Sequence, residues 1–125
     1  MRLFVYGSLL SGEKNHAVLA GAPKIADSQT WAAYVLVDLG PYPALLEGGD
    51  TSVRGELYDV DAGTLAVVDA FEGHPLLYRR ASVRLADGEH VAGYVLNEVE
   101  LAAGRPVIAT GDWKKARGQA GSGTR

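Results

Sequence analysis

The sequence predicts a small α+β domain, or a small barrel, rather than a doubly wound α/β fold. Short segments rich in β-branched and aromatic residues recur along the 125 residues, whereas only two short segments have a helical pattern. None of the predicted strands is followed by the long crossover helix that a parallel sheet needs. We expect one domain over residues 1–116 and a disordered tail, rich in glycine and polar residues, over residues 117–125.

Five segments are predicted as strands. The first is a compact apolar run that stops at Gly7, and the second is broken by the glycine and prolines that follow it. The third contains Gly55, which marks either a bulge or a close backbone approach. The last two alternate around Asp87-Gly88, a dipeptide typical of tight hairpins. The five segments are Arg2–Tyr6, Trp31–Leu39, Val53–Val60, Tyr78–Leu85 and His90–Leu96.

Two short helices are predicted between these strands. One covers Glu13–Leu19 and is followed by a glycine that closes it. The other covers Ala62–Phe71, with Asp61 as its N-cap and Gly73 at its C-terminal end.

Composition and charge exclude several classes of function. The net charge of -3 and the pI near 5.5 make nucleic acid or an anionic membrane an unexpected partner. The absence of cysteine excludes disulfides, thiolate metal sites and a cysteine nucleophile, and the three histidines do not stand at metal-ligand spacing. The apolar residues at the N-terminus are too few for a signal sequence or a membrane span, so we expect a cytoplasmic location.

The end of the second predicted helix contains an acidic residue at an apolar position. Leu65, Val68 and Glu72 lie at i, i+3 and i+7, so a helix that turns the first two toward the core also turns Glu72 inward. Burial and the negative end of the helix dipole are both expected to raise the pKa of Glu72. The alternative is that Glu72 points to solvent or pairs with Arg79 or Arg80.

Four segments in order carry a family resemblance. They are residues 4–9 (FVYGSL), 39–44 (LGPYPA), 53–58 (VRGELY) and 65–73, which ends in Phe-Glu-Gly and is followed by Tyr78-Arg79-Arg80. Each segment alone is a weak signal, but the set in this order, over roughly residues 2–113, resembles the gamma-glutamyl cyclotransferase-like (AIG2-like) family. That family includes gamma-glutamylamine cyclotransferases.

The resemblance implies a fold and a site. Family members fold as a small mixed β-barrel with short helices packed outside, so we expect that architecture here. By motif position, Glu72 is implied as the catalytic acid/base. Tyr78 is a further candidate for contacting Glu72 or the substrate, although a strand tyrosine is more often a packing residue. The residues implied for substrate binding through the turn and its backbone N–H groups are Tyr6, Gly7, Ser8 and Leu9.

The implied reaction converts a gamma-glutamyl amine or gamma-glutamyl amino acid to 5-oxoproline and a free amine. The α-amino group of the substrate attacks its own γ-carbonyl, so neither a protein nucleophile nor a cofactor or metal is needed, and proximity contributes about 7–11 kcal/mol. An ordinary glutamate takes the ammonium proton uphill by about 5 kcal/mol, which a raised pKa of Glu72 reduces. Backbone donors of residues 7–9 are expected to bind the substrate carboxylate or the oxyanion, with Gly7 permitting a close approach.

Other functions remain open from the sequence. The same barrel could bind a small anionic or amino-acid ligand without turnover, or Glu72 could activate water in a hydrolase. A glycosidase with paired carboxylates is the least favoured, because Glu56 and Asp69 are interpreted as structural and no other acid is placed near Glu72. The leaving amine and the oligomeric state are not determined by the sequence.

Overall fold

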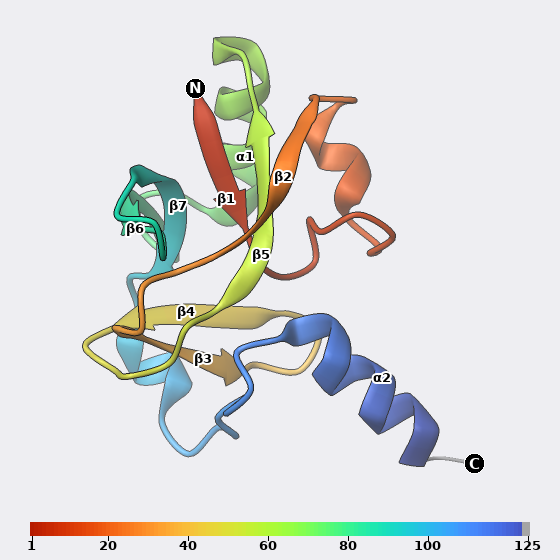
Figure 1. Ribbon diagram of the computed structural model, residues 1–125, viewed down its shortest axis with the longest axis vertical. Coiled ribbons are helices and arrows are strands. Elements are labelled where there is room, and N and C mark those ends of the chain that lie inside the picture. Colours follow the sequence, from red (N-terminus) through yellow and green to blue (C-terminus); the bar gives the residue numbers. More distant parts are fainter. Residues whose placement is uncertain (124–125) are drawn as a thin grey trace.

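The protein consists of two β-sheets with short helices around them (Figure 1). The computed structural model describes residues 1–123. The larger sheet has the strand order β2-β5-β1-β7-β6, and β3 pairs with β4 in a second sheet. The strands are β1 (Arg2–Val5), β2 (Lys24–Gln29), β3 (Tyr34–Asp38), β4 (Pro43–Glu47), β5 (Arg54–Asp59), β6 (Tyr78–Arg84) and β7 (His90–Leu96). The helices are α1 (Ala62–Glu72) and α2 (Trp113–Gly123), with 3-10 turns η1 (His16–Leu19) and η2 (Val99–Ala102).

Strand β1 is the centre of the larger sheet. It pairs antiparallel with β5 and parallel with β7. The side chains of Leu3 and Phe4 are fully buried on opposite faces of this strand, as expected for a continuous apolar run with neighbours on both sides. The sheet is therefore mixed, with both parallel and antiparallel pairs. Strand β1 ends at Val5, and the turn beginning at Gly7 leads the chain out of the sheet.

The expected barrel is not confirmed, although the α+β class is. The two edge strands, β2 and β6, come together only at their ends, around the isolated bridge between Thr30 and Leu85. There the N–H of Trp31 donates to the carbonyl of Arg84 at 2.9 Å. Within residues 1–123 the edge strands form no continuous ladder, which closure of a barrel requires. Strand β2 is mostly exposed, so little apolar surface draws it along β6.

Helix α1 begins and ends where local chemistry predicts. The side chain of Asp61 accepts a hydrogen bond of 2.7 Å from the N–H of Thr64, which caps the first turn. Gly73 follows the helix in the left-handed conformation with φ of 68°. Val68 is fully buried and Leu65 packs at the edge of the core, so the apolar face predicted from the sequence is confirmed.

Several elements differ from the sequence prediction. Strands β2 and β4 were not among the predicted strands: β2 is a polar, exposed edge strand, and β4 begins at Pro43, the first strand position, where proline is tolerated. The helix predicted over Glu13–Leu19 is only the short 3-10 turn η1. Residues 117–123, expected as part of a disordered tail, continue α2. Trp113 is buried at the start of this helix and Arg117 donates to the carbonyl of Gly40 at 3.3 Å, which extends the ordered chain past residue 116.

Residues 124 and 125 of the predicted tail lie outside the described residues. The helices within residues 1–123 are too short or too polar to cross a membrane.

Candidate active site

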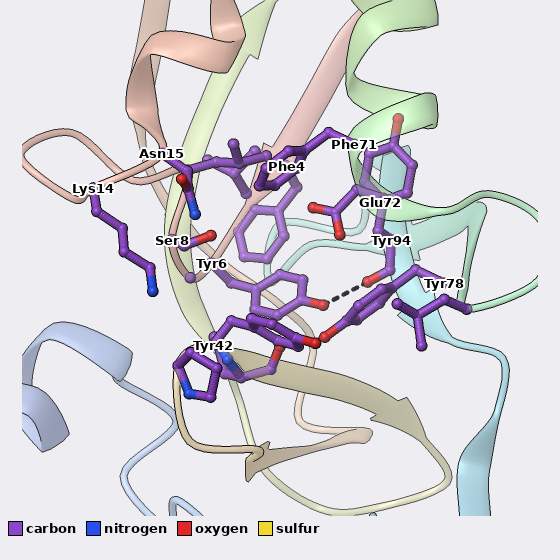
Figure 2. Close-up of a pocket in the computed structure, with 16 residues that line it drawn as sticks. Phe4, Tyr6, Ser8, Lys14, Asn15, Tyr42, Phe71, Glu72, Tyr78 and Tyr94 are labelled. Carbon is purple, nitrogen blue, oxygen red and sulfur yellow. Dashed lines mark hydrogen bonds between the residues drawn. The ribbon is translucent and has the colours of Figure 1, made fainter. Parts of the chain in front are cut away.

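A cavity of about 400 Å³ opens at the end of β1. Its walls come from β1 and the turn after it, from residues 41–43 before and at the start of β4, from the last residues of α1, and from β6 and β7 (Figure 2). The five residues implied by the resemblance and the further candidate Tyr78 all line this cavity: Tyr6, Gly7, Ser8, Leu9, Glu72 and Tyr78. Segments far apart in the sequence are thus brought to one place, while the role of each residue stays a prediction.

Within the described part of the chain, Glu72 is the only acidic residue that lines this cavity. The end of α1 directs its carboxylate into the cavity, above the rings of Tyr6 and Tyr78 (Figure 2). Burial raises the pKa of Glu72 to about 7. Although the residue as a whole is half-buried, its carboxylate accepts no hydrogen bond from residues 1–123, so nothing compensates for the lost hydration.

The alternative pairing of Glu72 with an arginine is wrong. Arg79 forms an ion pair with Glu47, and Arg80 forms one with Asp69 at 3.2 Å. Both arginines are on β6, and their partners lie on β4 and α1. The expected acidic residue of the cavity is therefore left without a cationic partner among the described residues.

Three buried tyrosines surround the carboxylate of Glu72, and the hydroxyl group of each donates a hydrogen bond to another acceptor. Tyr6 donates to the carbonyl of Tyr94 at 2.7 Å, Tyr78 donates to the carbonyl of Pro43 at 2.9 Å, and Tyr94 donates to Asp69 at 2.6 Å. Burial raises the pKa of all three phenols, and the charge of Glu72 raises each of them further. The tyrosines are therefore neutral, and they present ring surface rather than a free proton to a ligand.

The turn after β1 offers hydrogen-bond donors, whereas Glu72 offers an acceptor. The carbonyl of Gly7 accepts from the N–H of Leu10 and that of Ser8 from the N–H of Asn15, both at 3.0 Å. The carbonyl of Leu9 is 2.9 Å from Nδ1 of His16. In the part of the chain that the structure describes, the N–H groups of residues 7–9 have no hydrogen-bond partner. The turn thus has partners for its three carbonyls and leaves three successive N–H donors unused.

Gly7 is needed for packing against the protein itself. A Cβ atom at this position would lie 2.6 Å from both Cγ and Cδ of Pro43. The close approach expected at Gly7 therefore exists, but its partner in the structure is the segment that starts β4. This contact brings the turn and residues 41–43 together as adjoining walls of the cavity.

Several lining residues were not found from the sequence. Tyr94, Tyr42, Lys14 and Asn15 all line the cavity. Tyr94 occupies one position in an alternating strand, and Lys14 lies in a segment expected as a helix, so neither gave a local signal. Lys14 and Asn15 lie across the cavity from Glu72 (Figure 2). Among residues 1–123, no three histidine, aspartate or glutamate side chains are grouped as they would be to hold a metal ion.

Comparisons with known proteins point to one family. The sequence model of the family described as "Gamma-glutamyl cyclotransferase, AIG2-like" matches residues 3–115. A Vibrio cholerae protein named "Putative gamma-glutamylcyclotransferase" is 40% identical over 111 residues, which are 89% of this chain and 93% of that protein. The human protein named gamma-glutamylaminecyclotransferase is 38% identical over 92 residues, which are 66% of this chain and 60% of that protein.

A solved structure extends the similarity to the fold. The crystal structure of a protein specific to uropathogenic E. coli superimposes with a TM-score of 0.83 at 25% identity and covers 94% of each chain. The resemblance seen in the sequence motifs is thereby confirmed over almost the whole chain. The protein belongs to the gamma-glutamyl cyclotransferase, AIG2-like family.

Proposed function

We propose that this protein is a gamma-glutamyl cyclotransferase that converts a gamma-glutamyl amine or gamma-glutamyl amino acid to 5-oxoproline and a free amine. The observation that carries the proposal is the unpaired carboxylate of Glu72 in a cavity whose other wall holds the unused N–H groups of residues 7–9. Membership of the family supports the reaction class. The reaction needs one proton carrier and a set of donors for an oxyanion, and the cavity contains both.

Glu72 serves first as base and then as acid. It removes a proton from the α-ammonium group of the substrate, whose nitrogen attacks the γ-carbonyl carbon and closes a five-membered ring. Glu72 then returns the proton to the departing nitrogen as the amide bond breaks. The ring nitrogen loses its second proton as the intermediate collapses, and the released amine takes it up, so the products are a neutral lactam and an ammonium ion. With the pKa of Glu72 at about 7 and that of an α-amino group at about 7.7–8.0, the first transfer is uphill by only about 1 kcal/mol.

The turn after β1 stabilises the negative charge that develops on the γ-oxygen. Backbone donors that are already oriented need no reorganisation during the reaction, and one well-placed donor contributes about 3–4 kcal/mol. The neighbouring rings of Tyr6, Tyr78 and Tyr94 exclude water from the glutamyl chain and hold it in the curled shape that ring closure requires.

A glycosidase with paired carboxylates is disfavoured, because Glu72 has no second carboxylate beside it in the cavity lining. Asp69 accepts hydrogen bonds or ion-pair contacts from Tyr94 and Arg80, and neither Asp69 nor Glu56 lines the cavity. A hydrolase and a binding protein without turnover remain as outcomes of the test below, because both would use the same cavity.

The test is mass spectrometry of the products formed from a panel of gamma-glutamyl amino acids and gamma-glutamyl amines in water enriched in ¹⁸O. Unlabelled 5-oxoproline formed faster than without protein supports the proposal, because ring closure takes no oxygen from water. Labelled glutamate identifies a hydrolase instead. Saturable binding with no product identifies a binding protein, and the absence of both binding and product rejects the proposed site.

A further inference from the structure

The turn after β1 is held from behind by a buried carboxylate. Glu56 lies on β5 opposite Val5, the last residue of β1, and is only 6% exposed. Its Oε1 atom accepts a hydrogen bond of 2.8 Å from the N–H of Ser11 and another of 2.8 Å from the hydroxyl of Tyr58. Ser11 comes two residues after Leu9, so Glu56 holds the far end of the turn, whose residues 7–9 line the cavity and have unused N–H groups.

The second carboxylate oxygen has different partners. Oε2 of Glu56 is 3.5 Å from Nζ of Lys24 and 3.8 Å from Nζ of Lys114, at the start of α2. Burial alone would raise the pKa of Glu56, but the hydrogen bonds from Ser11 and Tyr58 together with the two lysines lower it. The two oxygens of Glu56 therefore have different roles: Oε1 holds the turn, and Oε2 forms ion pairs.

The turn needs such a support because its own hydrogen bonds fix only part of it. The carbonyls of residues 7–9 are engaged by Leu10, Asn15 and His16, all of which follow the turn in the chain. These contacts hold the turn to the segment after it, whereas the bond from Ser11 to Glu56 holds it to the sheet. The sheet in turn positions Tyr6, and through it the wall of the cavity that faces Glu72.

We propose that Glu56 is a positioning residue for the proposed reaction: its Oε1 atom holds Ser11 so that the N–H groups of Gly7, Ser8 and Leu9 stay directed at the substrate. Glu56 does not line the cavity and touches no substrate. The inference rests on the proposed function for its kinetic consequence, but its structural part, the orientation of the turn, can be measured without turnover.

Two substitutions separate hydrogen bonding from charge. Glu56→Gln keeps an oxygen at the same reach and loses the charge, whereas Glu56→Asp keeps the charge and withdraws the oxygen from Ser11. If Glu56 positions the turn, kcat/KM of the Gln variant stays within about 3-fold of the wild type, and that of the Asp variant falls by about 10- to 100-fold. The pH profile set by Glu72 stays in place in both variants, because neither changes the surroundings of that carboxylate.

Tyr58→Phe is the matched control. It removes the other hydrogen bond to Oε1 and leaves the bond from Ser11 intact, so kcat/KM is expected within about 3-fold of the wild type. Loss of activity in the Gln variant with retention in the Asp variant would overturn the inference in favour of the ion pairs with Lys24 and Lys114. Equal losses in Glu56→Asp and Tyr58→Phe would also overturn it, since the effect would then be a general one on the sheet.

A readout without substrate keeps the inference separate from the proposed function. In ¹H–¹⁵N spectra, the amide signals of Gly7, Ser8 and Leu9 are expected to move in Glu56→Asp and to stay near their wild-type positions in Glu56→Gln. The reverse pattern contradicts the inference even if no gamma-glutamyl compound is turned over. If the Asp variant does not fold, slow hydrogen exchange of the Ser11 amide in the wild type and in Glu56→Gln supports the inference, and fast exchange in the wild type rejects it.

Discussion

The hydroxyl of Tyr6 donates a hydrogen bond of 2.7 Å to the carbonyl of Tyr94 and accepts one of 3.2 Å from the N–H of Leu45, all in the interior. Tyr6 follows β1, Tyr94 is on β7 and Leu45 is on β4, so one side chain connects the two sheets. The same ring lines the cavity below Glu72 (Figure 2). A residue implied for substrate binding is thus also a structural link, and its proton is already used.

Tyr6→Phe is expected to lower the free energy of unfolding by about 1–3 kcal/mol, because it leaves a buried carbonyl and a buried N–H without their partner. Urea denaturation measures the loss. Tyr42→Phe is the control, since the Tyr42 hydroxyl has no hydrogen-bond partner in the described part of the chain and its loss should change stability by less than about 0.5 kcal/mol. Equal stability of the Tyr6→Phe variant and the wild type would contradict the structural link.

Glu72→Gln is expected to lower kcat by about 10²- to 10⁴-fold while the protein stays folded, because glutamine keeps the shape of the side chain and cannot carry the proton. Release of 5-oxoproline is the measurement, and circular dichroism verifies folding. Glu47→Gln is the matched control, because Glu47 is exposed and pairs with Arg79 outside the cavity. A folded Glu72→Gln enzyme with wild-type rates would reject Glu72 as the proton carrier.

The activity should depend on pH through Glu72. Since the base must be ionised and the pKa of Glu72 is raised to about 7, kcat/KM is expected to rise as the pH increases through about 7. Rates measured from pH 5 to pH 9 on one substrate locate this limb. A limb near pH 4.5, the ordinary value for glutamate, would show that Glu72 is solvated in the free enzyme or is not the base.

Stability should depend on pH in the opposite direction. The folded protein retains the proton of Glu72 up to about pH 7, whereas the unfolded chain releases it near pH 4.5. The contribution of protonated Glu72 to the free energy of unfolding is therefore fully present below about pH 4.5 and is lost as the pH rises to about 7. This loss lowers the free energy of unfolding by at most about 3 kcal/mol. Glu72→Gln lacks this group, so the difference in unfolding free energy between variant and wild type should grow over that interval. A constant difference would refute the raised pKa.

Gly7→Ala should affect both stability and activity. The new Cβ would lie 2.6 Å from the ring of Pro43, so the turn or the start of β4 has to move, at a cost of about 1–3 kcal/mol. Gly63→Ala in α1 is the control, because its Cβ would meet only the Asp61 side chain, at 3.7 Å. We expect kcat/KM to fall only in the Gly7 variant. Unchanged kinetics there would show that the donors of the turn do not contribute.

Lys14 gives a prediction about the leaving amine. Among residues 1–123 it is the only basic residue that lines the cavity, it is exposed, and it lies across from Glu72 (Figure 2). If a carboxylate on the leaving group contacts Lys14, Lys14→Met should raise KM for gamma-glutamyl-alanine by about 2- to 5-fold, the effect of an exposed ion pair, and leave gamma-glutamyl-ethylamine unchanged. Equal effects on both substrates would place Lys14 against the glutamyl part instead.

Local patterns in the sequence were sufficient to predict helix α1, the hairpin of β6 and β7, and the inward direction of Glu72. The cap at Asp61, the glycine at position 73 and the spacing of Leu65, Val68 and Glu72 act within one or two helical turns, so they can be interpreted without knowing the rest of the fold. The family motifs added the turn at residues 6–9. Its four residues and Glu72 all line the cavity.

Contacts between distant segments were decided only by the tertiary structure. Strand β2 is polar, and β4 begins at a proline, so each becomes a strand only because a partner strand is already in place. The hydroxyl of Tyr6 is occupied by groups 39 and 88 positions away, and Glu56, interpreted from the sequence as a structural carboxylate, holds Ser11 across 45 positions. The physical reason is that hydrogen bonds and burial depend on which groups meet in space, and periodicity along the chain specifies only which face a residue occupies.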